Sequence, residues 1–332
     1  MCKEYRPDGM NIELTTCCPL HCPQCYCSLQ GGKHIPLDVV KARLKEAAAL
    51  GVRHVELSGG ETMCYPHLYE AVAAARQLGI APSIAVSGWH FDDEALEKLI
   101  DAGIDTISVS LNGPTKETNA WTRDGYELAI HALKTLQRHH FCNTLINWVM
   151  HRSSVEYLPE MIALARRYEV GVIVIIEPKS PYGGELSSYP TKAQLQAVAD
   201  MVKHTRGDVE LSVQHCFSPL LALSSENRLW GNTNRGRYKG CTAGICSFCV
   251  NVDGSFTPCR HLEYAEQWES LQAYWEKSSI LQSLRTWDSG HAEPCISCHL
   301  SPYCRPCAAL AGVPEDDGGG RVHCSLADSR EP

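Results

Sequence analysis

The chain has 332 residues, of which 44% are hydrophobic, and it carries a formal net charge of −8 at pH 7. This length and composition are enough to bury a large core, so we expect one barrel-sized domain with a smaller companion and exclude disorder as the default. The negative charge gives no electrostatic reason to bind nucleic acid or an anionic membrane surface.

The chain has 18 cysteines, and whether they bind metals or form disulfides depends on the cellular compartment. The first residues lack the apolar block of a signal peptide, and no run approaches the roughly 18 to 20 apolar residues of a membrane span. A cytoplasmic protein without membrane attachment is therefore expected. Thiols there stay reduced, so dense cysteine clusters favour metal ligands over the alternative of a secreted disulfide scaffold.

Short β-rich runs alternate with amphipathic helical segments from about residue 11 to about residue 182. The expected strands are residues 11–16, 54–59, 83–88, 106–112, 144–150 and 170–178. The expected helices are residues 37–50, 67–79, 92–103, 126–137 and 154–168. This alternation predicts an α/β protein with a parallel, right-handed array, either a barrel or a doubly wound sheet. In both, ligands bind at the carboxyl ends of the strands.

The pattern changes in the last third of the chain. A further helix at residues 191–205 and a strand at 209–213 continue the array. From about residue 231 the sequence becomes glycine-rich and then cysteine-rich, and helix returns only at residues 266–287. We therefore place a domain boundary after residue 230 and interpret residues 314–321 as a mobile loop.

Five cysteines lie within eleven residues directly after the first expected strand. Cys18, Cys22 and Cys25 have the spacing C-x3-C-x2-C. Three thiolates suit a soft metal or an iron–sulfur cluster but are one short of the four that close a structural zinc site or a cubane cluster. One iron would thus stay open to another ligand. Cys17 and Cys27 are core or spare thiols, although either is also a possible ligand.

A second set of cysteines lies beyond the expected boundary. Its members are Cys241, Cys246, Cys249, Cys259, Cys295, Cys298, Cys304, Cys307 and Cys324. Taken alone, the run C-x2-C-x5-C-x2-C formed by the four from 295 to 307 also fits a zinc ribbon.

Together these motifs resemble the radical S-adenosylmethionine (SAM) superfamily. The CxxxCxxC motif is followed by Gly59-Gly60-Glu61 after the second strand, and the distal cysteines resemble the family's SPASM extension. Twelve residues separate Cys241 from Gly254 and four separate Gly254 from Cys259, as in that extension, while x2 replaces x3 before Cys307. The resemblance implies a partial (β/α)6 TIM-like barrel in residues 1–230 and a smaller, irregular, cysteine-rich auxiliary-cluster domain in residues 231–332.

The resemblance also implies the cofactors. Cys18, Cys22 and Cys25 would hold a [4Fe–4S] cluster whose open iron is chelated by SAM. An electron from a donor such as flavodoxin or ferredoxin would cleave SAM to methionine and a 5′-deoxyadenosyl radical, which abstracts a hydrogen atom from the substrate.

Several residues match positions where the family contacts SAM. Gly59 and Gly60 would let the backbone approach the methionine moiety, and Glu61 would accept from its ammonium group. The further expected contacts are Ser87, Ser110, Asn112, Arg123 and Asn147. Each has a simpler alternative, either a strand-to-loop turn or a strand-end polar group satisfied by backbone.

Two departures affect the expected SAM contacts. The family usually has an aromatic residue just before the third cysteine, where this chain has Gln24, with Tyr26 following instead. The family's S-L-D-G segment reads S-L-N-G here, which removes a negative charge at Asn112.

The family topology crosses the two halves of the distal cysteines. The first auxiliary cluster would be held by Cys241, Cys246, Cys259 and Cys307, with Cys249 as the rival of Cys246. The second would be held by Cys295, Cys298, Cys304 and Cys324.

Enzymes with the SPASM extension mostly modify ribosomally made peptides, so the resemblance implies the maturation of such a peptide by cross-linking or oxidation. The sulfatase-modifying branch carries an aspartate as base where this chain has Arg260, which argues against that branch. The short segment before the cluster motif leaves no room for a leader-binding module, so recognition would use the barrel or a separate protein. The alternatives are a radical SAM enzyme acting on a small molecule, such as a decarboxylase or dehydrogenase, and a zinc-stabilised binding module.

Three more residues lie near the expected radical face. Glu177, His90 and Cys64 are candidates for substrate contact or proton transfer. Their alternatives are solvated loop residues and a buried thiol.

Overall fold

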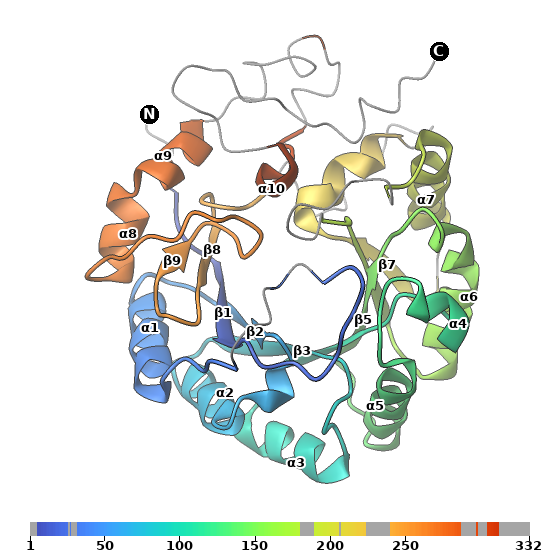
Figure 1. The fold of residues 1–332 in the computed structure, drawn as a ribbon, viewed down its shortest axis with the longest axis horizontal. Coiled ribbons are helices and arrows are strands. Elements are labelled where there is room, and N and C mark those ends of the chain that lie inside the picture. Colours follow the sequence, from blue (N-terminus) through green and yellow to red (C-terminus); the bar gives the residue numbers. More distant parts are fainter. Residues whose placement is uncertain are drawn as a thin grey trace.

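The computed structural model describes residues 5–25, 27, 32–179, 189–205, 207–223, 240–286, 297 and 304–311. A curved nine-stranded sheet has the strand order β7-β6-β5-β4-β3-β2-β1-β8-β9 (Figure 1). The strands are β1 (Gly9–Thr15), β2 (His54–Gly59), β3 (Ala81–Val86), β4 (Thr106–Ser110), β5 (Thr144–Val149), β6 (Val172–Ile176), β7 (Glu210–Val213), β8 (Ser247–Val250) and β9 (Phe256–Thr257). All neighbours are parallel except β8 and β9. Among the described residues no pairing joins β7 to β9, so the barrel is open.

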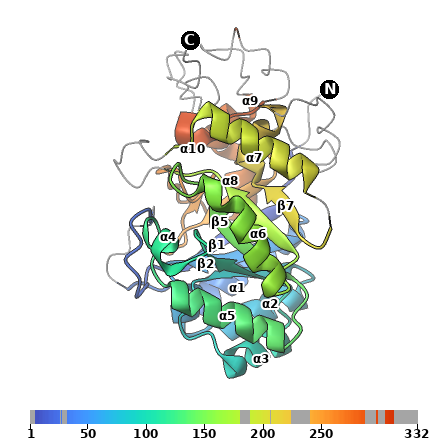
Figure 2. The same cartoon turned by 90° about the vertical axis from the view of Figure 1, so that its right-hand side faces the viewer.

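Helices between the strands cover the outer face of the sheet (Figures 1 and 2). They are α1 (Leu37–Ala49), α2 (Leu68–Gln77), α3 (Asp93–Ala102), α5 (Tyr126–Arg138), α6 (Leu158–Arg167) and α7 (Lys192–His204). Shorter helices are α4 (Lys116–Ala120), α8 (Leu271–Lys277), α9 (Ser279–Thr286) and α10 (Ala308–Ala311). This arrangement confirms the expected α/β partial barrel.

Alternation along the strands separates the core from the inner face of the barrel. On β1, Met10, Ile12 and Leu14 are at most 4% exposed and belong to the hydrophobic core. The residues between them, Asn11 and Glu13, are half-buried on the opposite face. Because side chains alternate across a strand, the polar set points into the barrel. β2 repeats the pattern, and the inner face near β1 is therefore polar.

The C-terminal part of the chain joins the same sheet. The expected boundary after residue 230 lies outside the described residues, and β8 beyond it pairs in parallel with β1. The division into two domains thus stays a prediction. The helix expected at residues 266–287 is two helices, α8 and α9, separated at Ser278. In the part of the chain that the structure describes, no helix is long and apolar enough to cross a membrane.

Candidate active site at the carboxyl ends of the strands

The loop after β1 carries the three motif cysteines. Cys18, Cys22 and Cys25 are free and half-buried, and the amide of Cys25 donates to the carbonyl of Cys22 at 3.0 Å. Burial raises the pKa of Cys18, while a hydrogen bond that Cys25 donates to Cys27, followed by burial, raises the pKa of Cys25. Cys18 and Cys25 are therefore favoured as neutral thiols without a metal, so loading a cluster must displace their protons.

The turn after β2 packs directly on the cysteine loop. The amide of Gly60 donates to the Thr15 carbonyl at 2.7 Å, and that of Glu61 donates to the Cys17 carbonyl at 2.8 Å. A Cβ atom at Gly59 would lie 2.3 Å from the Thr15 oxygen, and one at Gly60 would lie 2.4 Å from the Cys17 oxygen. Both glycines are thus required by the close approach of this chain's own backbone, a reason that the motif alone did not reveal.

Glu61 and Ser87 meet at the ends of neighbouring strands. Glu61 is 2% exposed, and its carboxylate accepts from the backbone amides of Ser87 at 2.8 Å and Met63 at 3.2 Å. Burial raises the pKa of Glu61, and the positive charge of Arg123 opposes that shift. An ammonium group placed beside Glu61 would favour the ionised carboxylate.

The segment that carries Arg123 is tied to the cysteine loop. The amide of Gln24 donates to the Thr122 carbonyl at 3.3 Å. Arg123 also lies close enough to Cys18 for its charge to oppose the burial-driven rise in the pKa of that thiol. Among the described residues, the buried Gln24 Oε1 and Arg123 Nε have no hydrogen-bond partner. Such orphaned groups beside three free thiols fit a bound polar cofactor.

The Asn112 side chain is buried and makes its hydrogen bonds within the protein. Its Nδ2 donates to Thr122 Oγ1 at 3.0 Å, its Oδ1 accepts from the Val149 amide at 3.1 Å, and it is 1% exposed. These bonds favour the simpler alternative of a satisfied strand-end group. Ser110 and Asn147 lie opposite each other in the register of β4 and β5. Their contacts with SAM stay predictions, as do those of the other family-matched positions.

Cys64 and His90 occupy different surroundings. Cys64 lies in the turn directly after Glu61, and burial, followed by a hydrogen bond that Cys64 donates to Cys17, raises its pKa to about 12. His90 is exposed, adopts φ +50°, and packs edge-on against Trp89 at 4.9 Å between ring centroids. Neither arrangement decides a catalytic role.

Glu177, directly after β6, forms a buried charged group. Its carboxylate accepts from Lys179 Nζ at 2.9 Å and from the Tyr189 hydroxyl at 2.7 Å, and it is 3% exposed. Lys179 Nζ also lies 3.6 Å from Cys216 Sγ. One ligand atom each from Glu177, Cys216 and Cys307 lies within 4.8 Å of the others, a spacing that would suit a single metal ion. The Lys179 ammonium already supplies a cation beside this group.

Replacing Lys179 with methionine should leave Glu177 buried without its counter-charge. We expect the free energy of unfolding to fall by about 3 to 5 kcal/mol, and the double variant Lys179→Met/Glu177→Gln to recover much of that loss. Urea unfolding of anaerobic protein with equal iron content measures both. A loss below about 1 kcal/mol for Lys179→Met would show that the pair is dispensable.

Three of the distal cysteines, Cys241, Cys259 and Cys307, lie near this group. Burial, and after it the nearby Cys307 thiol, raises the pKa of Cys241. Burial, and after it the nearby Cys241 thiol, raises the pKa of Cys259 to about 12. A hydrogen bond from Cys216 lowers the pKa of Cys307 to about 7. Cys241, Cys259 and Cys307 are therefore close together, and Cys216 is a neighbour that the sequence analysis missed.

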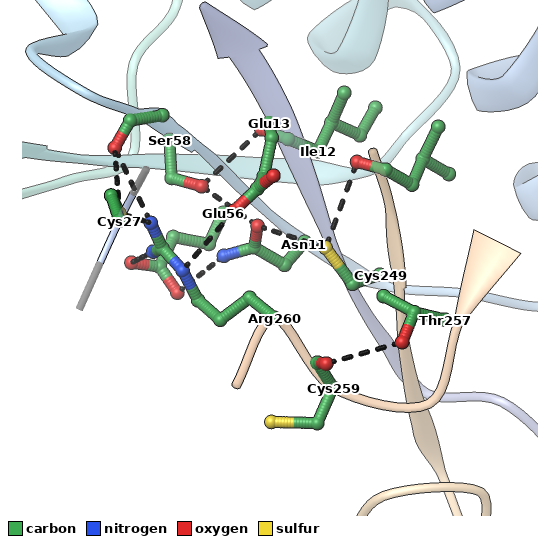
Figure 3. A network of polar contacts seen from close by, with 12 residues as sticks. Asn11, Ile12, Glu13, Cys27, Glu56, Ser58, Cys249, Thr257, Cys259 and Arg260 are labelled. Carbon is green, nitrogen blue, oxygen red and sulfur yellow. Dashed lines mark hydrogen bonds and ion pairs between the residues drawn. The ribbon is translucent and has the colours of Figure 1, made fainter. Parts of the chain in front are cut away.

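Cys246 and Cys249, the alternative ligands of the first auxiliary cluster, lie at different positions. Cys249 Sγ points from β8 toward Asn11 Oδ1 at 3.6 Å (Figure 3). Cys246 is buried in the turn before β8, where its carbonyl accepts from the amide of Gly9 at 3.1 Å. Of the second expected set, Cys304 is half-buried, whereas Cys295, Cys298 and Cys324 lie outside the described residues. The choice between Cys246 and Cys249 as a ligand stays open.

Comparison with known proteins assigns the chain to a family. Residues 12–165 match the model of the radical SAM superfamily. The chain is also 31% identical over 328 residues to a PqqA peptide cyclase of Gluconobacter oxydans (strain 621H), a match that covers 92% of this chain and 87% of that relative. The chain belongs to the radical SAM superfamily. A radical SAM enzyme uses a [4Fe–4S] cluster and SAM, and the three thiols with their orphaned polar neighbours fit that pair.

Solved structures share the fold of this radical SAM enzyme. Streptococcus suis SuiB bound to its precursor peptide SuiA has a TM-score of 0.80 at 18% identity, over 97% of this chain and 76% of that chain. Native anSMEcpe with bound AdoMet has a TM-score of 0.73 at 16% identity, over 97% and 94% of the two chains. The likeness extends over nearly the whole chain.

Proposed function

We propose that this radical SAM enzyme modifies a ribosomally made peptide by cross-linking or oxidation. The observation that carries the proposal is the 31% identity to a PqqA peptide cyclase over 87% of that relative's length. The SuiB structure that shares the fold contains a precursor peptide, which supports the same class of substrate.

The residues around the cysteine loop have separate tasks in this proposal. Cys18, Cys22 and Cys25 hold the cluster, which together with SAM supplies a 5′-deoxyadenosyl radical. Glu61 holds an ammonium group through a carboxylate that backbone amides already orient. Arg123, with its unpartnered Nε, binds the SAM carboxylate.

The further cofactors and partners are part of the same proposal. Cys241, Cys259 and Cys307, with Cys246 or Cys249, hold a first auxiliary cluster, and Cys304 contributes to a second. The close grouping of the first three thiols supports this assignment. Flavodoxin or ferredoxin supplies the electron, and a separate protein or the polar inner face of the barrel recognises the peptide.

The proposal is tested with short peptides encoded beside this gene. Anaerobically reconstituted enzyme, SAM, a reductant and the cognate peptide should yield methionine, 5′-deoxyadenosine and a peptide lighter by two hydrogen atoms for each cross-link. Mass spectrometry of the peptide measures the loss. If no encoded peptide changes mass, while a small molecule does, the peptide assignment is wrong.

A further inference from the structure

Arg260 connects segments that are far apart in the sequence. Its guanidinium lies 3.7 Å from Glu13 Oε1 on β1 and 4.0 Å from Glu56 Oε1 on β2. Nη2 donates to the Gly59 carbonyl at 3.3 Å and lies 3.9 Å from Cys27 Sγ (Figure 3). The side chain is 16% exposed. One cation thus contacts two strands and the cysteine loop.

The carboxylates around Arg260 are themselves held in place. Asn11 Nδ2 donates to Glu56 Oε2 at 3.0 Å, and Ser58 Oγ donates to Asn11 Oδ1 at 2.7 Å. Burial raises the pKa of Glu13, and the charge of Arg260 opposes that rise. Because guanidinium is planar, contacts on several edges fix its orientation as well as its position.

The contact with Gly59 reaches the SAM motif. The peptide unit between Gly59 and Gly60 is held at both ends, since its oxygen accepts from Arg260 and its N–H donates to the Thr15 carbonyl at 2.7 Å. Glu61 follows this peptide unit directly. The orientation of this peptide unit therefore sets the position of the Glu61 backbone. Of the groups that hold the unit, Arg260 is the one that comes from the C-terminal region.

We propose that Arg260 is a positioning residue for SAM binding, which fastens the Gly59-Gly60-Glu61 turn to the loop after β9. Cys259, expected to bind an auxiliary cluster, directly precedes Arg260 on that loop. The two cofactor regions are thereby joined through one side chain. This role holds for any substrate and so goes beyond the peptide assignment.

The test compares the affinity of anaerobically reconstituted holoenzyme for SAM in wild type, Arg260→Met and Arg260→Lys. Loss of the charge-assisted hydrogen bond should weaken SAM binding about tenfold in Arg260→Met. Lysine keeps the charge but cannot contact several groups at once as the planar guanidinium does. The SAM affinity of Arg260→Lys should therefore lie between those of wild type and Arg260→Met. The electron paramagnetic resonance spectrum of the reduced cluster with SAM should also change in Arg260→Met, at unchanged iron content.

Arg285 offers a matched control in the same region. Its Nε donates to the Gly244 carbonyl at 2.8 Å and its Nη1 to the Trp275 carbonyl at 2.7 Å, while its guanidinium lies 4.4 Å from the centre of the Trp275 ring. Arg285→Met therefore removes comparable bonds without touching the SAM motif. It should lower stability and leave SAM affinity within about twofold of wild type.

The outcomes separate this inference from the proposed function. Unchanged SAM affinity in Arg260→Met, or equal losses in Arg260→Met and Arg285→Met, would overturn the role of Arg260 even if the peptide is modified. Weakened SAM affinity in Arg260→Met alone supports it even if the substrate is not a peptide. If Arg260→Met fails to fold, Arg260→Lys decides, because wild-type affinity and spectrum in that variant would overturn the role.

Discussion

Replacing Cys18, Cys22 and Cys25 together with alanine is expected to abolish the formation of 5′-deoxyadenosine. All three are free thiols on one loop, beside the orphaned polar groups of Gln24 and Arg123. Without them no iron is held where SAM is expected to bind, so reductive cleavage has no site. Chromatography of reactions with SAM and a reductant measures the product.

Iron analysis of the same variant tests the auxiliary clusters as well. Three cubane clusters predict about twelve irons for each wild-type chain, and about eight for the triple variant. Cys142, which is exposed on a loop, provides the control because Cys142→Ala should keep both iron and product. Persistence of 5′-deoxyadenosine in the triple variant would refute the assignment of the loop, and zinc without iron would refute the cluster chemistry altogether.

Replacing Gly60 with alanine is expected to reduce 5′-deoxyadenosine formation at least about a hundredfold. The added Cβ would meet the Cys17 carbonyl oxygen at 2.4 Å and Cys18 Cβ at 3.1 Å. Backbone atoms cannot give way as a flexible side chain can, so the turn and the cysteine loop must separate. A displacement of about 1 Å at a reacting centre costs a rate factor of this size.

A glycine without such neighbours gives the control for Gly60→Ala. At Gly171, before β6, an added Cβ would meet no atom within 4 Å, and the residue has no positive φ. Gly171→Ala should therefore keep the wild-type rate, measured with both proteins at equal iron content. Wild-type activity in Gly60→Ala would contradict the close packing of the turn on the cysteine loop.

The strands of the barrel could be predicted because their signal is local. Buried residues alternate with polar ones on β1, and the expected range 11–16 differs from the observed Gly9–Thr15 only at the ends. β8 could not be predicted in this way. Its four residues, Ser247–Val250, lie in a cysteine-rich segment, and their strand conformation depends on pairing with β1, more than 200 residues away in sequence.

The candidate site, like the fold, could be predicted from the sequence only in part. The resemblance to the radical SAM superfamily implied that Glu61 and Ser87 lie together at the SAM site, and the structure brings the two into contact at 2.8 Å. The group formed by Glu177, Lys179 and Cys216 could not be predicted from the sequence, because Cys216 lies on a different segment from Glu177 and Lys179. Glu177 is 3% exposed, so its interpretation as a solvated loop residue is wrong, whereas its catalytic role stays a prediction.

The transfer of deuterium from a labelled peptide to 5′-deoxyadenosine tests the central claim most directly. Reconstituted enzyme, unlabelled SAM, a reductant and the cognate peptide deuterated at its carbon positions are incubated without oxygen, and the nucleoside is analysed by mass spectrometry. We predict 5′-deoxyadenosine that carries one deuterium atom, formed together with the modified peptide. A modified peptide accompanied only by unlabelled 5′-deoxyadenosine would contradict hydrogen abstraction by this radical SAM enzyme.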